Sequence, residues 1–452
     1  MPFGSVVGFR PQKTELLTRT LTRKGRTYVM EGKSKSLLFR NRDFGLLWSG
    51  ESVSLLGSEI SIIALPSLAV LVFGEGTLGV GVLVALQWIP FVLLAPLLGV
   101  FTDRFRRRPL MHFANIGRFI TLGSLPLAAV LGHLTVTHLY AAALVKGIFD
   151  VVFQLAYQAY LPNLLEREDF ADGNAKTQLS RSLAVVLGRS AGGGLVGLIG
   201  AAKAVTADAF SYLVSSLTLL FIRSKEPAPA VAARGFGATL GELKAGVALT
   251  FGNRLLRYLT LMATFGNMAV SMTLAMIIVY AYKDLDFGPG RLGLALAAGG
   301  FAVVAGAMLS RKINAKYGMG RTLIFTHLVL GVAFVLLPTA QTGGTAFAFT
   351  VIVVSQLISS FTSPIANVGI MTLIQKATPP QAMGRVGGVA LPFVWGANAI
   401  GPLLGSGIAA ISNNATTFFV AAAMAWIATI WIVLGSVHTL FDEVPVELRV
   451  AV

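Results

Sequence analysis

Long apolar runs separated by short polar stretches dominate this chain. Twelve of the runs approach the roughly 20 residues that a helix needs to cross a ~30 Å hydrocarbon layer. Because a backbone in lipid must satisfy its own hydrogen bonds, each run is predicted to be a transmembrane helix. The runs cover residues 44–73, 80–102, 109–132, 138–161, 178–200, 204–222, 258–282, 292–310, 322–340, 345–374, 386–411 and 416–437.

The polar stretches divide the chain into two helical bundles joined by a linker. The linker opens with a run of Pro and Ala that cannot continue a helix. Its later part, Thr239 to Leu256, is expected to be an amphipathic helix on the inner membrane surface. The predicted parts are a basic N-terminal tail (1–43), a six-helix bundle (44–222), the linker (223–257), a second six-helix bundle (258–437) and a C-terminal tail (438–452).

The basic tail does not have the pattern of a signal peptide. It carries ten Lys and Arg but no long apolar run and no cleavage site of small residues. Met30 is followed directly by the segment that leads into the first apolar run, so we expect either Met1 or Met30 to be the start. In both cases the tail is interpreted as a solvated segment beside the membrane.

Composition and charge support a membrane protein. Hydrophobic residues make up 55% of the 452 residues and charged residues 12%, whereas soluble proteins average about 25% charged. The net charge is +16, but 29 of the 36 Lys and Arg fall on one side of the predicted membrane, with only Lys203, Lys283 and Arg291 on the other. This bias predicts that both termini are cytoplasmic. Because membrane orientation accounts for the positive net charge, no nucleic-acid binding is predicted. The chain has no cysteine, which excludes disulfides, zinc–thiolate sites and cysteine nucleophiles.

The two predicted bundles repeat each other's motifs. GVFTDR, from Gly99 to Arg104, follows the second run, and GAMLSR, from Gly306 to Arg311, follows the eighth. GRSAGG in the fifth run has GPLLG as its counterpart in the eleventh. Duplicated bundles are typical of secondary transporters, whose substrate site lies where the repeats meet near the bilayer midplane.

The stretch GVFTDRFRRRPL between the second and third runs resembles the loop signature of the major facilitator superfamily, G-x-L-a-D-r-x-G-r-k. Arg106 replaces the second glycine. Three further stretches resemble the macrolide-efflux-like and siderophore-exporter-like branch: RNRDFGLLWSGESVSLLGSEISIIALP, AYQAYLPNLLEREDFADGNAK and PPQAMGRVGG. The resemblance implies an all-α membrane protein in which twelve transmembrane helices form two pseudo-symmetric six-helix bundles. The residues that match the signature, and that it implies as the conformational gate, are Gly99, Asp103, Arg104, Arg107 and Arg108.

The sequence also departs from antiporters of this superfamily. They often carry G-P-x-x-G-G in the fifth span, where this chain has Arg189 in place of the proline. The arginine pattern usual in the fourth span is missing, and Lys146 precedes Gly147 instead. Antiporter mechanics therefore do not transfer directly from the resemblance.

Ionisable residues inside the predicted spans are candidate functional groups. A charge at the bilayer centre costs about 2.5–3.5 kcal/mol, so each should face a cavity or a partner. All of them lie in the first half, and in the second half His327 is the one group within the spans that titrates near neutral pH. They are Glu51, Glu59, Arg118, Lys146, Asp150, Arg181, Arg189 and Asp208.

Helical rise places Glu59, Asp150 and Arg189 near mid-membrane. The resemblance implies that their spans line the central cavity, so we expect the three to converge there. A carboxylate that meets an arginine in only one conformation can take up a proton in the other, which would couple transport to protons. Glu51 and Arg181, nearer the inner face, are further candidates. The alternative is a static ion network that ties the spans together.

Structural roles are expected for the other charges. Lys146 and Asp150 are four residues apart and should pair on one helical face. Arg118 is expected to partner an acid on a neighbouring helix, and Asp208 to be structural. Aromatic and amide side chains in an apolar cavity would suit a bulky amphipathic cargo. The candidate cargo-binding residues are Gln87, Trp88, Gln154, Tyr157, Asn267, Gln356, Asn367, Trp395 and Asn398.

These observations favour an alternating-access exporter of an amphipathic molecule of the drug, antibiotic or siderophore type, in exchange for protons. An uncoupled lipid or sugar carrier, and a receptor or scaffold that kept the fold, are alternatives. No nucleotide-binding loop, metal-ligand spacing or catalytic triad is apparent, so neither an enzyme, a cofactor nor a metal site is predicted. The expected partners are the small-molecule cargo, protons and membrane lipids, with the chain acting as a monomer in a bacterial inner membrane.

Overall fold

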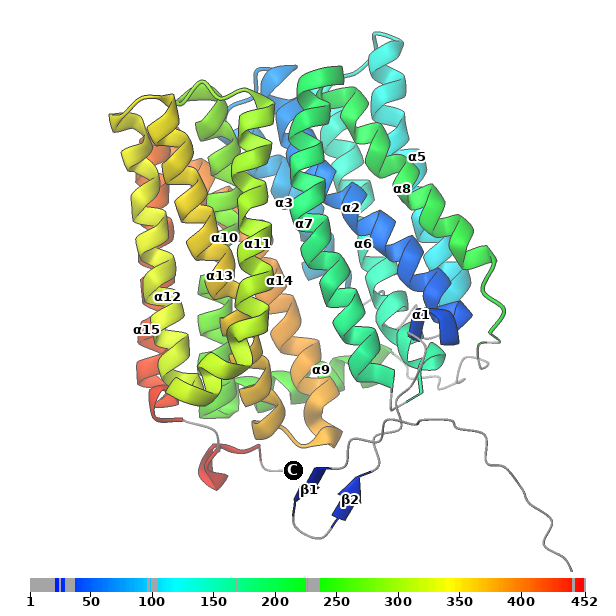
Figure 1. The fold of residues 1–452 in the computed structure, drawn as a ribbon, viewed down its shortest axis with the longest axis vertical. Helices are drawn as coiled ribbons and strands as arrows, with labels where there is room; N and C mark the ends of the chain where they lie inside the picture. Colours follow the sequence, from blue (N-terminus) through cyan, green and yellow to red (C-terminus); the bar gives the residue numbers. More distant parts are fainter. Residues whose placement is uncertain are drawn as a thin grey trace, which may run out of the picture.

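The structure is a computed structural model that describes residues 21–23, 26–28, 37–95, 98, 105–166, 169–224, 226, 236–440 and 444–450. Long helices packed side by side make up most of it (Figure 1). The first bundle contains α2 (Arg42–Leu71), α3 (Thr77–Leu93), α5 (Arg107–Val130), α6 (Val136–Leu164), α7 (Phe170–Ile199) and α8 (Ala201–Leu220). The second contains α10 (Arg254–Lys283), α11 (Pro289–Tyr317), α12 (Met319–Leu336), α13 (Thr345–Ala377), α14 (Pro380–Ile411) and α15 (Asn414–Leu434).

Each of the twelve predicted spans corresponds to one of these helices, so the predicted fold class is confirmed. Ten helices in the described part of the chain are long and apolar enough to cross a membrane, and α3, from Thr77 to Leu93, is a shorter apolar helix. Such a chain is a multi-pass membrane protein.

Apart from η2 (Leu337–Thr342), which follows α12 at the opposite end, the remaining elements lie near the end of the bundle that holds the C-terminus (Figure 1). The helix α9 crosses there, in the linker where the sequence predicts a surface helix, and it packs against α14 through Gly246 and the carbonyl of Arg385. We call this end the terminal end. The smaller elements are β1 (Leu21–Arg23) paired antiparallel with β2 (Arg26–Tyr28), α1 (Leu37–Arg40), α9 (Phe236–Gly252), η2 (Leu337–Thr342), η3 (Val437–Thr439) and η4 (Val446–Leu448).

The first helix of each half begins in the same way. The side chain of Asn41 accepts a hydrogen bond from the Phe44 amide at 2.9 Å, and that of Asn253 accepts one from the Leu256 amide at 3.0 Å. An asparagine N-cap satisfies one of the free amides at a helix start. The repeated cap aligns α2 with α10 residue by residue. The N-cap positions Arg106 and Gly318 align α5 with α12, and Thr135 and Gly344 align α6 with α13, although these pairs of caps differ in kind.

Each half has its own apolar core. In the first half, Leu68, Leu83 and Leu122 are fully buried in a cluster that joins α2, α3 and α5. In the second half, Met276 and Phe418 are fully buried between α10 and α15. The two cores touch through Ile63 of α2, which packs in the second core, and Val279 of α10, which packs in the first.

The halves meet along two helix pairs, α7 with α11 and α3 with α14. At the α7–α11 contact the backbones touch, because a Cβ added to Gly293 would lie 2.7 Å from the Cα of Gly193. Two hydrogen bonds join the halves at the end far from the termini, from Lys283 Nζ to the Gly74 carbonyl (3.2 Å) and between Ser67 Oγ and Tyr282 Oη (2.6 Å). The molecule is therefore closed at that end, which we call the closed end.

Candidate functional site

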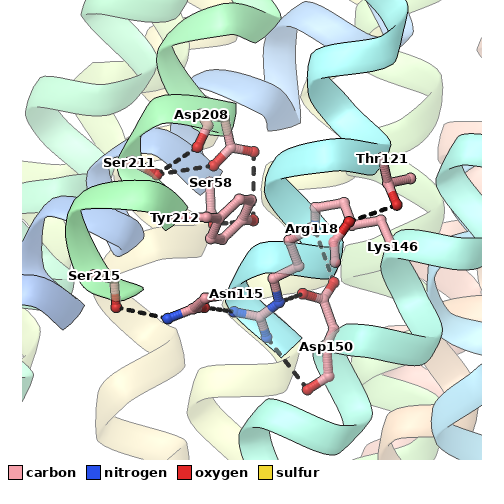
Figure 2. Close-up of polar contacts among 11 residues, drawn as sticks. Ser58, Asn115, Arg118, Thr121, Lys146, Asp150, Asp208, Ser211, Tyr212 and Ser215 are labelled. Carbon is pink, nitrogen blue, oxygen red and sulfur yellow. Dashed lines mark hydrogen bonds and ion pairs between the residues drawn. The ribbon is translucent and has the colours of Figure 1, made fainter. Parts of the chain in front are cut away.

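A cluster of charges lies inside the first bundle, centred on Arg118 of α5 (Figure 2). Arg118 Nε lies 2.9 Å from Asp150 Oδ1, and Lys146 Nζ donates to Asp150 Oδ2 at 2.7 Å. The arginine and lysine side chains are only 6% and 9% exposed. The predicted pairing of Lys146 with Asp150 is confirmed, as is the prediction that Arg118 partners an acid on a neighbouring helix.

Neighbouring polar and aromatic groups hold the Arg118 guanidinium in place. Its Nη1 donates to Asn115 Oδ1 at 3.2 Å, and Asn115 in turn donates to Ser215 of α8 at 3.0 Å. The guanidinium also lies over the ring of Phe153, 4.2 Å from its centroid. Hydrogen bonds from different guanidinium nitrogens together with a cation–π contact fix an arginine in one orientation. The cluster thereby ties α5, α6 and α8 together.

Asp208 lies at the edge of this cluster on α8 and is fully buried. Ser211 Oγ donates to its Oδ1 at 3.3 Å, and Tyr212 Oη donates to its Oδ2 at 3.5 Å (Figure 2). Tyr212 Oη also bonds Ser58 of α2 at 3.0 Å. These contacts lie within one bundle, in keeping with the structural role expected for Asp208.

A second ion pair joins α2 to α7. Arg189 Nε donates to Glu59 Oε2 at 2.8 Å, and the two side chains are 14% and 19% exposed. Glu59 and Arg189 therefore meet, as expected. Asp150 does not join them, because its two oxygens face Arg118 and Lys146. The expected three-residue convergence is thus divided between two separate networks.

Glu51 of α2 differs from both acids. Its side chain is buried, at 7% exposed, and its Oε2 has no hydrogen-bond partner among the described residues. Arg118 and Arg181 are the cations that act on it electrostatically. Arg181 on α7 is itself exposed. An unpaired buried carboxylate is costly as an anion and is stabilised by taking up a proton.

Of the predicted gate residues, Gly99, Asp103 and Arg104 lie outside the described part of the chain. Arg107 and Arg108 open α5, and their backbone amides donate to the two carboxylate oxygens of Glu226, at 2.7 and 3.3 Å. A carboxylate at a helix N-terminus is favoured by the helix dipole. The sequence gives no signal for this role of Glu226, because the residue lies in the linker.

The predicted cargo-binding residues lie in several different surroundings. Trp88 of α3 and Trp395 of α14 are linked through Phe91, with ring centroids 5.3 Å apart in both contacts. Tyr157 is buried in the core of the first bundle, stacked on Phe153. Asn267 and Asn367 line one cavity in the second bundle. Gln356 is buried, and the half-buried residues are Gln87, Gln154 and Asn398.

The tryptophans thus form an aromatic bridge between the two halves, consisting of Trp88, Phe91 and Trp395. Sequence analysis missed Phe91, although its spacing of three from Trp88 places both on one helical face. Aromatic rings at the meeting point of two repeats offer stacking surface to an apolar cargo.

Comparison with known proteins adds independent information. The sequence profile of the Major Facilitator Superfamily matches residues 47–397. The chain is 25% identical over 270 residues to the uncharacterized MFS-type transporter YvqJ of Bacillus subtilis (strain 168), a match that covers 58% of this chain and 62% of that relative. It is 23% identical over 368 residues to the class C tetracycline resistance protein of Escherichia coli, covering 79% and 84%.

Solved structures share the fold. The nucleoside transporter NupG superposes with a TM-score of 0.69 at 14% identity, covering 87% of this chain and 99% of that one. A bacterial homologue of the iron transporter ferroportin superposes with a TM-score of 0.70 at 15% identity, covering 89% and 100%. At 14% and 15% identity, these two likenesses show a shared fold and nothing more.

Proposed function

Because this chain belongs to the Major Facilitator Superfamily, as the profile match to residues 47–397 establishes, we propose that it is a proton-coupled exporter. Its cargo is an amphipathic organic molecule of the drug, antibiotic or siderophore type, and its site is a bacterial inner membrane with both termini cytoplasmic. The likeness to a tetracycline resistance protein supports an efflux role. The 29 Lys and Arg on the terminal side support the orientation.

The observation that carries this proposal is the ion pair between Glu59 and Arg189. Both side chains retain some exposure, so water and protons reach a carboxylate that has one cationic partner. Protonation of Glu59 neutralises it and releases Arg189, which changes the relative free energies of the two facing states. Arg189 is also next to the close α7–α11 contact, because its carbonyl lies 2.8 Å from a Cβ added to Gly293. The Glu59–Arg189 ion pair therefore lies next to the tight contact between α7 and α11.

Glu51 is the second proton carrier in this proposal, since its Oε2 has no hydrogen-bond partner among the described residues. Asp150 is instead assigned to the structural cluster, because two cations hold it. The gate assignment is kept for Arg107 and Arg108, at the start of α5 where Glu226 caps the helix, and for Gly99, Asp103 and Arg104, which lie outside the described residues. The aromatic bridge supplies the cargo's apolar contact.

Export against a proton gradient tests the function. Purified protein in liposomes is loaded with ethidium or tetracycline as probe cargo, and efflux is followed as a proton gradient is imposed. We expect the gradient to accelerate efflux at least about tenfold in the wild type, and Glu59→Gln to remove this acceleration while leaving probe binding within about twofold. Gradient-independent efflux in the wild type would indicate an uncoupled carrier, and no flux of any probe would indicate a receptor or scaffold.

The control is Glu75→Gln. Glu75 lies outside the α2–α7 pair, beyond the end of α2, and changing its charge leaves the Glu59–Arg189 contact intact. Its gradient response should match the wild type. A gradient response that Glu59→Gln leaves unchanged would count against Glu59 as the coupling group.

A further inference from the structure

The second bundle contains a polar cavity between α10, α12 and α13. Its volume is about 80 Å³, enough for several water molecules or for one polar group of a small organic molecule. Its polar lining comes from Asn267, Thr326, His327, Ser359, Ser363 and Asn367. No Asp, Glu, Lys or Arg is among the described residues that line it.

Two side chains on its wall each present a hydrogen-bond acceptor. His327 is buried, at 5% exposed, and its Nδ1 is 2.9 Å from the Leu323 carbonyl, which can only accept. Nδ1 therefore carries the proton, and Nε2 of the neutral ring keeps a lone pair. Asn267 Nδ2 likewise donates a hydrogen bond to the Ala263 carbonyl, at 2.9 Å, which leaves Oδ1 as the acceptor. Neither His327 Nε2 nor Asn267 Oδ1 has a partner among the described residues.

The local packing keeps His327 Nε2 accessible. A Cβ added to Gly266, the residue before Asn267, would lie 3.0 Å from Nε2. The glycine thus leaves space beside the nitrogen. Ser363 and Asn367 on α13 are exposed, and polar side chains at this depth avoid lipid. The side of the cavity formed by these two residues is therefore expected to face water and not lipid.

The corresponding place in the first bundle is filled with charge. Counting from the N-cap positions, His327 corresponds to Asn115, Leu330 to Arg118, and Ser359 to Asp150. In the first bundle, Arg118 and Asp150 satisfy each other. In the second, both positions hold neutral residues, so no ion pair occupies the cavity, and among the described residues His327 Nε2 and Asn267 Oδ1 keep free acceptor positions. This difference favours a binding site over a structural network.

We propose that this cavity is a cargo subsite that takes a neutral hydroxyl or N–H group, with His327 Nε2 and Asn267 Oδ1 as its acceptors. The inference rests on the proposed function and narrows its substrate class. The aromatic bridge holds the apolar body of the cargo, and the subsite selects compounds that carry a hydrogen-bond donor. Because no carboxylate lines the subsite, a donor without charge is preferred over an ammonium group.

Matched pairs of probes test the subsite. Binding of 4-hydroxybiphenyl, 2-naphthol and estradiol, each against its methyl ether, is measured by titration calorimetry on the purified full-length protein. Each pair differs by one donor hydrogen. The wild type should bind the phenols about tenfold more tightly than the ethers, since an unmade hydrogen bond at a buried acceptor is costly. His327→Leu should reduce this ratio to within twofold while ether affinity stays unchanged.

Two variants separate acceptor chemistry from folding. His327→Gln keeps an acceptor and should retain most of the preference. Thr264→Val removes a hydroxyl on α10 that bonds its own helix and does not line the cavity, so the preference should be unchanged. A preference that survives His327→Leu, or equal wild-type affinity within every pair, overturns the subsite. Gradient-driven efflux of the ethers reports on the proposed function separately, because the ethers have no donor for the subsite acceptors.

Discussion

At the scale of single residues, the acidic side chains of the first bundle differ in how many cationic partners they have. Asp150 has two cationic neighbours, Glu59 has one, and Glu51 Oε2 has no hydrogen-bond partner among the described residues. The pairing of Lys146 with Asp150 could be predicted, because residues four apart share a helical face. The division of Glu59 and Asp150 into separate networks could not, because it depends on how each helix is rotated about its axis.

The Arg118–Asp150 pair gives a prediction on stability. Asp150→Asn leaves the buried Arg118 and Lys146 without their shared counter-charge, which should lower the free energy of unfolding by about 3–5 kcal/mol. Arg118→Leu combined with Asp150→Ser copies the neutral pair Leu330 and Ser359 of the second bundle. It should recover the part of that loss that comes from Arg118, while Lys146 stays without its counter-charge. Thermal unfolding in detergent measures both. A double variant as unstable as Asp150→Asn would contradict the interpretation of Arg118 as an uncompensated charge.

At the scale of elements, the sequence was sufficient to predict all twelve helices of the two bundles. In the described part of the chain, ten helices are long and apolar enough to cross a membrane, which is the pattern that hydropathy detects. Their ends were harder to predict. The helix α7 begins at Phe170, eight residues before the predicted start, because the polar stretch from Ala171 to Thr177 continues the helix beyond the apolar run. Helix contacts were outside the reach of hydropathy, since the pattern gives no information on which helices are neighbours.

The contact between α7 and α11 gives a prediction for one element. Gly293→Ala places a Cβ 2.7 Å from the Cα of Gly193, so the two helices must move apart. The conformation that is shut at the closed end should therefore become less populated. We expect transport to fall at least about fivefold and labelling of a single cysteine introduced at Ser67, which is fully buried at the closed end, to become faster. Gly290→Ala, three residues earlier in α11 and with open space around it, is the matched control. Equal transport by the two variants would argue against a tight α7–α11 seal.

At the scale of the whole molecule, duplication produced two bundles of the same fold with different chemistry. The first bundle contains the ion pairs, whereas the described part of the second has a neutral cavity in the corresponding place. We infer a division of labour in which one half responds to protons and the other selects the cargo. The two must then be coupled through the helices at which they meet, so rocking of one half against the other is the step that links proton and cargo.

Cross-linking tests whether that rocking is required. The chain contains no cysteine, so Ser67→Cys with Tyr282→Cys introduces one reactive pair across the closed end without background. A rigid bis-maleimide of about the length of a tyrosine side chain should join the pair and abolish gradient-driven efflux. Cargo should still bind from the terminal side, because the cross-link holds the closed end shut and leaves the terminal side accessible. Each single variant treated with the same reagent should transport as before. Continued efflux from fully cross-linked protein would mean that cargo crosses without separation of the two halves at this end.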